Sequence, residues 1–482
     1  MPRPNQEKTV NLQVSNTKKT LLALAALLAL TAALYAPVAG YGFVYDDREL
    51  VLQNPRLMSW DQAPGYFTSD FFSHHAGVRI GYYRPVTLLW MRAVYAVAGP
   101  PQPLWHVAGI LLHLATVAAL YILLLRITMD WRAALAAAGL FALHPLQAET
   151  VAWVSAQGDL LATLFTILAL YFAIARKGSV SYASLAFAML AAFSKEAGVL
   201  APAAILAYEL TRARGKDAVR AVLPYLLPML LYAALRENAL HGVNLRPAGS
   251  YAAMSTLTMV LTWPRVLAAY AAHLLLPWKL GLSYDVFPAQ AWWPLAVLLA
   301  LAAAAVWWLR GSSGQVRFGA AWLALCLLPA LAIRNMTPAL DFVHDRYAYL
   351  PMAALAVLAA SWLANAQRWR WQAAGTVLVL MALGMLTYRT LPHWRNEIAA
   401  YSQAVQTAPH NSTMWNNLGG AYWEAHDMNS AIPCFEQAIA VGARDALPYL
   451  NLAHYYDANG DSEKAAEYRQ AARQMQHRAP RY

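Results

Sequence analysis

Apolar runs long enough to cross a lipid bilayer recur along most of this sequence. About 20 residues suffice to span the hydrocarbon core as a helix, and such runs alternate with short polar loops from about residue 20 to residue 390. The chain is 59% hydrophobic and 13% charged, which lies outside the usual range of soluble domains. The pattern predicts an all-α fold, a polytopic membrane helix bundle.

The basic residues predict which way the chain enters the membrane. The formal net charge is +11, but Lys and Arg fall mostly in short loops between apolar runs, which is typical of cytoplasmic loops and argues against a nucleic-acid partner. Residues 1–19 are polar and basic, so we place them in the cytoplasm. A cleavable signal peptide is an alternative for the first run. That run continues past Tyr35 into a polar segment, which favours a retained anchor at about 20–41.

Later runs extend the transmembrane domain to residue 392, with about eleven crossings and a first external loop at about 42–103. Within that loop, Pro85–Ala98 is the best candidate for an amphipathic surface helix. His144-Pro145 should end a run at the outer face, because proline breaks a helix. If 256–276 crossed the membrane fully, the later basic loops would lie on the outer side instead of the cytoplasmic side. We therefore expect a re-entrant or interfacial helix there.

Residues 393–482 contain a repeat. The spacing matches the tetratricopeptide unit, a helix–turn–helix of 34 residues, and the matching positions are Trp415, Leu418, Gly419, Tyr422, Ala431, Phe435 and Ala438. A second unit follows 34 residues on, and the second helix of an earlier unit precedes. Arg469 stands where Phe435 would map, as in an atypical solvent-facing cap. The span count places this tail on the same outer face as the first external loop.

Two adjacent carboxylates, Asp46 and Asp47, follow the first span. Charges at the membrane boundary need a partner, water or a function. The pair could catalyse a reaction or coordinate a metal, or it could simply end a helix and cap the next segment. The two cysteines, Cys326 in an apolar run and Cys434 in the tail, suggest neither a disulfide nor a metal cluster.

Other polar residues gather on the predicted outer face, namely Arg84, His144, Glu149, Lys195, Glu196, His344, Asp345, Arg346 and Tyr349. Sugar transfer from a lipid phosphate needs a carboxylate to accept the acceptor's proton and cations to stabilise the leaving phosphate. Arg346 could bind phosphate as a guanidinium fork or pair with a carboxylate. Arg84 could equally be an interfacial anchor, His144 and Glu149 could bound a turn, and Lys195 and Glu196 could form structural ion pairs.

Several segments together resemble one family: GFVYDDRELVLQNPRL, YYRPVTLLW, LWHVAGILLHLATVAALYILL, LFALHPLQAETVAWVSAQGDLLATLF, FSKEAG, LLLPWKLGLSYD and HDRYAYLP, followed by the repeats. Their order is similar to that of the transmembrane and TPR-containing O-mannosyltransferases of the GT-C glycosyltransferase superfamily. The resemblance implies that Asp46 or Asp47 is the catalytic carboxylate and that Arg84, Lys195 and Arg346 face the donor phosphate. It also implies that the repeats select a protein acceptor.

These observations predict an inverting membrane glycosyltransferase. It would transfer a sugar from a polyprenyl-phosphate donor to a hydroxyl, such as Ser or Thr of a protein, on the periplasmic face of a bacterial inner membrane. A divalent cation could bridge the acidic pair and the phosphate, although nothing in the sequence requires one. The alternatives are a non-catalytic membrane-anchored repeat scaffold and a ligase for lipid-diphosphate-linked oligosaccharides. A transporter fits less well, because the charges gather at one face.

Overall fold

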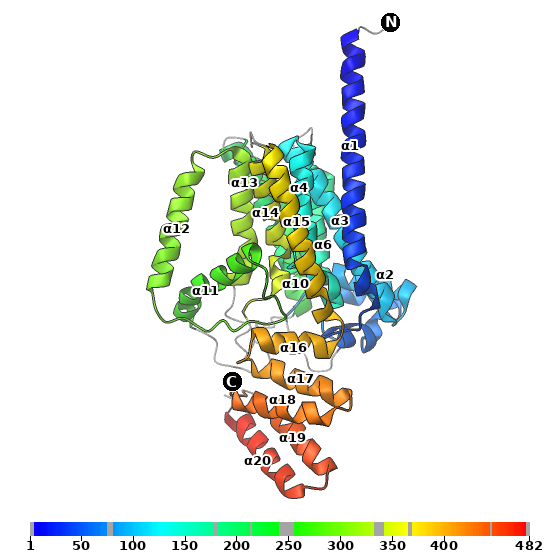
Figure 1. The fold of residues 1–482 in the computed structure, drawn as a ribbon, viewed down its shortest axis with the longest axis vertical. Helices are drawn as coiled ribbons and strands as arrows, with labels where there is room; N and C mark the ends of the chain where they lie inside the picture. The colour runs from blue at the N-terminus through cyan, green and yellow to red at the C-terminus, as the bar shows by residue number, and fades with distance from the viewer. Residues whose placement is uncertain are drawn as a thin grey trace.

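The computed structural model describes residues 4–74, 81–176, 181–212, 215–240, 255–331, 342–364, 369–443 and 446–478. Within these ranges the regular elements are all helices. A bundle of long helices carries a tail of short helices that points away from one end (Figure 1). The predicted all-α class, with a membrane bundle and a repeat tail, is confirmed.

Seven segments of the described chain are long and apolar enough to cross a bilayer. Their helices are α1 (Pro4–Tyr35), α3 (Gln102–Thr128), α6 (Gln157–Ala175), α10 (Leu226–Leu240), α13 (Gly314–Leu327), α14 (Tyr349–Ala364) and α15 (Trp369–Thr390). The other predicted crossings fall on shorter helices, α4 (Trp131–Leu143), α7 (Tyr182–Ser194), α8 (Ala201–Glu209) and α12 (Trp293–Leu309). Helix α8 has 9 residues. At a rise of about 1.5 Å per residue, it is by itself too short to cross a hydrocarbon core of about 30 Å.

The helix ends follow from local sequence. Asp130 caps α4 by accepting hydrogen bonds from the backbone N–H groups of Arg132 and Ala133, at 2.8 and 3.4 Å. The helix ends at Leu143, directly before His144-Pro145, as predicted. Most of the buried side chains of the bundle lie on α3, α4, α6 and α14. By contrast, α12 buries none of its residues within the chain, so its apolar surface is available to lipid.

Helix α11 (Thr256–Leu275) has 20 residues but is not among the segments apolar enough to span. It lies obliquely at the edge of the bundle nearest the tail (Figure 1). The re-entrant or interfacial position of this segment stays a prediction.

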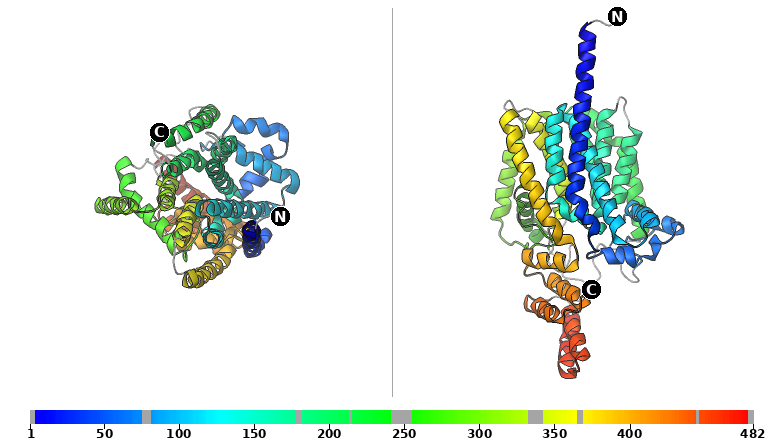
Figure 2. Two further views of the ribbon diagram at one scale, coloured as in Figure 1. Left: turned by 90° about the horizontal axis from the view of Figure 1, so that it is seen from above. Right: turned by 45° about the vertical axis from the view of Figure 1, so that its right-hand side comes forward.

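The predicted first external loop and the tail lie at the same end of the bundle, opposite the N-terminal end of α1 (Figure 2). The loop contains the predicted amphipathic helix, α2 (Pro85–Ala98). The N–H of Gly42 donates to the carbonyl of Arg395 at 2.9 Å, and the rings of Trp153 and Trp394 stack at 6.3 Å. The start of the tail therefore packs on the loop that carries the acidic pair, through Gly42, and on the segment before α6, through Trp153. That this end of the bundle is the outer face stays a prediction.

The tail consists of helical hairpins. Helices α17 (Ser412–Glu424) and α18 (Met428–Ala440) form one, α19 (Leu447–Ala458) and α20 (Ser462–Arg478) form the next, and α16 (Glu397–Thr407) is the lone helix of the earlier unit. A Cβ on Gly419 would come within 2.6 Å of the Phe435 ring, so this close packing requires glycine. Arg469, at the atypical position, pairs with Asp457.

Candidate active site

The two aspartates of the acidic pair have different surroundings. Asp47 is fully buried. One carboxylate oxygen accepts from the N–H and the hydroxyl of Ser155, at 2.7 and 2.5 Å, and the other accepts from the N–H of Val44 at 3.2 Å. Asp46 is partly exposed, and its carboxylate has no hydrogen bond or ion pair among the described residues. Asp47 thus ties the loop to the residues before α6, whereas Asp46 is available to a ligand.

Burial shifts the pKa of both carboxyl groups upward. It raises the pKa of Asp46 to about 6, against the opposing effect of the Arg346 and Arg84 charges. It raises the pKa of Asp47 to about 7, even though hydrogen bonds from Ser155 and Val44 favour the charged form. A general base works best when its pKa lies near the operating pH. Asp46 is therefore both accessible and suitably tuned to accept a proton.

A cavity of about 260 Å³ lies among the helices at this end of the bundle. Its polar residues are Tyr82, Arg84, Asp159, Thr163, Lys195, Glu196, Arg346 and Tyr347, and its apolar wall comprises Ala162, Ala197, Cys326, Pro329, Ala330, Leu350 and Pro351. The three predicted phosphate ligands, Arg84, Lys195 and Arg346, come from distant parts of the sequence and line this one cavity. A pocket lined by both cations and apolar groups suits an amphiphile that carries an anionic head.

Each cation also has a carboxylate partner. The shortest distances are 2.8 Å from Arg84 to Glu196, 2.5 Å from Lys195 to Asp159 and 2.6 Å from Arg346 to Glu149. Buried charges are costly unless they are paired in this way. Arg84 binds Glu196 through Nε and Nη2, which leaves its Nη1 without a hydrogen bond among the described residues.

Aromatic rings hold the cations in place. The Arg84 guanidinium lies 4.2 Å from the Tyr82 ring centroid. Tyr347 lies between two cations, with Lys195 at 5.2 Å and Arg346 at 4.8 Å from its centroid, and Trp153 lies 4.7 Å from Arg346. These cation–π contacts restrict the side chains and so favour a fixed constellation.

Three residues that the sequence analysis did not single out help to build the site: Ser155, Asp159 and Asp70. Asp70 is buried and accepts from the N–H groups of Phe72, Gly81 and Tyr82, at 2.8, 2.7 and 3.1 Å. It thereby fixes the backbone just before Arg84. Asp159 has a sequence signal, because a lone carboxylate inside an apolar run often marks a functional position. Nothing in the sequence distinguishes Ser155 or Asp70.

Asp46, Asp47 and the remaining predicted residues do not line the cavity. Glu149 pairs with Arg346 at 2.6 Å without lining the cavity. Asp345 accepts a hydrogen bond from the Tyr284 hydroxyl at 2.7 Å. The ring nitrogens of His144 and His344 lie 3.2 and 3.1 Å from the carbonyls of Leu274 and Leu282. The Tyr349 hydroxyl bonds to His113 at 2.7 Å. These contacts hold together segments that are distant in sequence and adjacent in the fold.

The acidic pair is poorly arranged to hold a metal ion. Both oxygens of Asp47 already accept hydrogen bonds, and the described residues contain no group of three or more His, Cys, Asp or Glu with a suitable arrangement.

Known proteins similar to this chain carry one activity in their names. The protein O-mannosyl-transferase TMTC3 of Mus musculus is 25% identical over 92% of this chain and 54% of its own length. Its Homo sapiens counterpart is 23% identical over 88% and 52%. The resemblance to this family is confirmed. A Caenorhabditis elegans protein O-mannosyl-transferase, F38B6.6, is 23% identical over 82% of this chain and 59% of its own length.

Two further comparisons cover the tail and the fold. A tetratricopeptide-repeat family model matches residues 412–441, which confirms the predicted repeat. Among solved structures, the Archaeoglobus fulgidus oligosaccharyltransferase in its apo form aligns with 84% of this chain and 59% of its own, at 12% identity and a TM-score of 0.37. That score is too low to support a structural argument. This chain spans about half the length of the TMTC3 proteins.

Proposed function

We propose that this chain is an inverting membrane glycosyltransferase that moves a sugar from a polyprenyl phosphate to a hydroxyl group, such as Ser or Thr of a protein. The cavity that joins Arg84, Lys195 and Arg346 to an apolar wall is the observation that carries the proposal. The cations match a phosphate, and the apolar wall matches the isoprenoid chain attached to it. The resemblance to protein O-mannosyl-transferases supports the same reaction class, with mannose as one candidate sugar.

The reaction is a single displacement. The acceptor oxygen forms a bond to the anomeric carbon while the bond from that carbon to the phosphate oxygen breaks. Asp46 takes the proton of the acceptor hydroxyl. The three cations neutralise the charge that grows on the departing polyprenyl phosphate. Asp47 and Ser155 anchor the loop that carries Asp46. Asp46 does not line the cavity itself, but the charges of Arg346 and Arg84, which do, act on its carboxylate.

The side of the membrane follows from the charge pattern. The basic N-terminus and the basic loops are cytoplasmic under the positive-inside rule, so the cavity and the repeat tail face outward. In a bacterium this side would be the periplasm.

Purified protein, a radiolabelled polyprenyl-phosphate sugar and a Ser- or Thr-containing acceptor peptide test the proposal directly. Wild-type protein should release polyprenyl phosphate, and Asp46→Asn should lower the rate about 10²- to 10⁴-fold, the usual contribution of a general base. Asp61→Asn is the matched control, because Asp61 is an exposed carboxylate of the same external loop. Its rate should equal that of the wild type.

Other outcomes would favour the alternatives. Release from lipid-diphosphate donors alone would indicate a ligase. If the folded wild-type protein released nothing from either donor, the non-catalytic scaffold would be the better interpretation. Unchanged release by Asp46→Asn would contradict the assigned base.

A further inference from the structure

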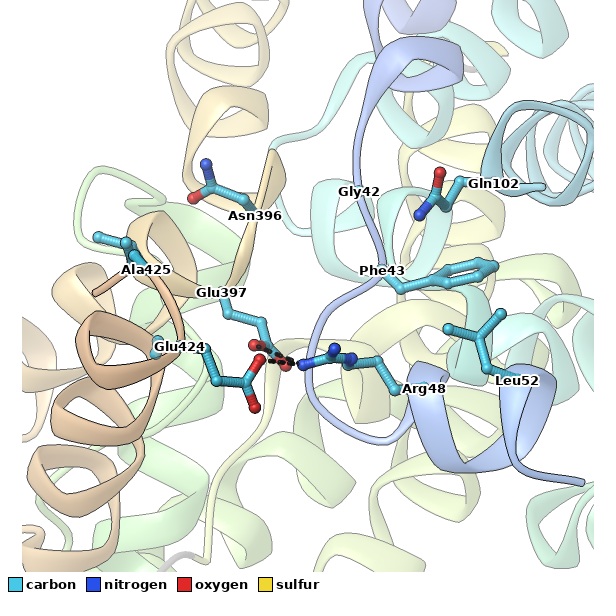
Figure 3. A pocket seen from close by; sticks show the side chains of 11 residues that line it. Gly42, Phe43, Arg48, Leu52, Gln102, Asn396, Glu397, Glu424 and Ala425 are labelled. Atoms are coloured by element: carbon cyan, nitrogen blue, oxygen red, sulfur yellow. Dashed lines mark hydrogen bonds and ion pairs between the residues drawn. The ribbon is translucent and has the colours of Figure 1, made fainter. Parts of the chain in front are cut away.

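A second hollow, a cleft of about 360 Å³, lies between the first external loop and the tail. The loop contributes Gly42, Phe43, Arg48 and Leu52, and the start of α3 contributes Gln102. The tail contributes Asn396, Glu397, Ile398, Ala421, Glu424 and Ala425. The cleft is distinct from the donor cavity, and its two walls come from parts of the chain about 350 residues apart in sequence (Figure 3).

The charged groups of this cleft carry a negative excess. Arg48 reaches across it to Glu424 on α17 and lies 3.8 Å from Glu397 on α16 (Figure 3). Two carboxylates thus share one guanidinium, in a chain whose net charge is +11. Burial raises the pKa of Glu397, and the charge of Glu424 adds to the rise although Arg48 opposes it. The Glu424 side chain is 58% exposed, so a ligand in solution can reach it.

The cleft adjoins the proposed base. Arg48 follows Asp46 by two residues, and the ring of Tyr45 contacts that of Tyr401 on α16 at 6.3 Å. Burial raises the pKa of Tyr401, and the charges of Glu397, Asp46 and Asp47 raise it further. Tyr401 therefore lies near both the carboxylates of the cleft and the acidic pair. A chain bound in the cleft would lie close to Asp46.

We propose that this cleft binds the acceptor, and that the acceptor is an extended polypeptide segment with Lys or Arg close to its hydroxyl residue. The proposal rests on the function proposed above. A cationic side chain complements Glu397 and Glu424, and such complementarity gives specificity and faster association. The side-chain amides of Gln102 and Asn396 line the same cleft (Figure 3). The Gln102 amide can both donate to and accept from the main chain of an extended segment. Asn396 can donate through Nδ2, because its Oδ1 caps α16 by accepting from the N–H of Ala399 at 2.9 Å.

The test compares two hydroxyl-bearing peptides that differ in one residue, Lys or Gln, next to the acceptor Ser or Thr. For the wild-type protein, kcat/KM should be about tenfold higher for the Lys peptide, which corresponds to about 1.4 kcal/mol. The preference should fall as salt rises, because salt screens exposed charges. In Glu397→Gln/Glu424→Gln the ratio should drop to near one. A ratio is informative even if the double variant turns over more slowly.

Glu436→Gln is the control, because Glu436 is an exposed carboxylate of the tail that does not line the cleft. It should keep the tenfold preference, and the single variant Glu424→Gln should show part of the loss. A wild-type ratio near one, or a ratio unchanged in the double variant, would overturn the proposed acceptor cleft.

Binding of fluorescent peptides separates this proposal from the proposed function. If donor release fails while the Lys peptide still binds in a Glu397- and Glu424-dependent way, the transferase assignment fails and the peptide cleft stands. If donor release persists without any preference for the Lys peptide, the transferase assignment stands and the cleft proposal fails.

Discussion

Alanine substitution of each aspartate separates the two roles that the structure suggests. Asp47→Ala removes the acceptor of three hydrogen bonds, from Val44 N–H, Ser155 N–H and the Ser155 hydroxyl. Asp46→Ala removes a carboxylate that has no hydrogen bond among the described residues. We therefore expect Asp47→Ala to destabilise the protein and Asp46→Ala to inactivate it without destabilising it.

The magnitudes follow from the contacts. A buried polar group left without a partner costs about 1–3 kcal/mol. Val44 is buried and Ser155 is partly buried, so Asp47→Ala should cost about 2–4 kcal/mol in total, because water can replace part of the loss at Ser155. Asp46→Ala should not lower stability, because the burial that raises the pKa of Asp46 disfavours its charged form in the folded protein at neutral pH. Its loss of turnover should be about 10²- to 10⁴-fold.

Thermal unfolding in detergent and donor release, measured on the same preparations, provide the assay. Asp47→Ala should lower the unfolding midpoint by several degrees and should retain measurable turnover per folded molecule. Ser155→Ala should reproduce part of the destabilisation. Equal destabilisation by the two alanine variants, or full turnover in Asp46→Ala, would refute the assigned roles.

Three further predictions concern the same site. Because the pKa of Asp46 is raised to about 6 and only the ionised carboxylate accepts a proton, kcat/KM should fall as pH decreases through about 6, as pH–rate measurements can show. Lys195→Ala and Arg346→Ala should raise the KM for the donor and lower kcat, because both cations line the cavity; an effect on the acceptor KM alone would contradict this. Asp70→Ala should weaken donor binding, measured by titration, because it frees the backbone that places Arg84. Unchanged donor affinity in that variant would contradict the positioning role.

The sequence predicted the membrane bundle and the repeat because both depend on local periodicity. Each prediction used residues close together in sequence: apolar runs for the spans, His144-Pro145 for a helix end and the 34-residue spacing for the repeat. The charged residues needed a second argument. The alternation of spans placed Arg84, Lys195 and Arg346 on one face together with other polar residues, and the family resemblance singled out these three. The structure brings them to one cavity.

The pairing inside the site could not be predicted from the sequence. Asp46 and Asp47 look equivalent as neighbours, and their difference comes from Ser155, 108 residues away. The partner of Lys195 is Asp159, on a different helix, whereas its sequence neighbour Glu196 binds Arg84. Which side chains pair depends on how the helices pack against one another, and local sequence patterns do not reveal that packing. For the same reason Tyr349 and His344 looked like candidate site residues, although their side chains hydrogen-bond to neighbouring segments.

The anomeric configuration of the transferred sugar tests the central claim most directly. A single displacement with Asp46 as general base inverts the anomeric carbon, so NMR of the glycosylated peptide should show the configuration opposite to that of the polyprenyl-phosphate donor. Retention of the donor configuration would require two displacements and a covalent intermediate, and it would contradict the mechanism proposed for Asp46.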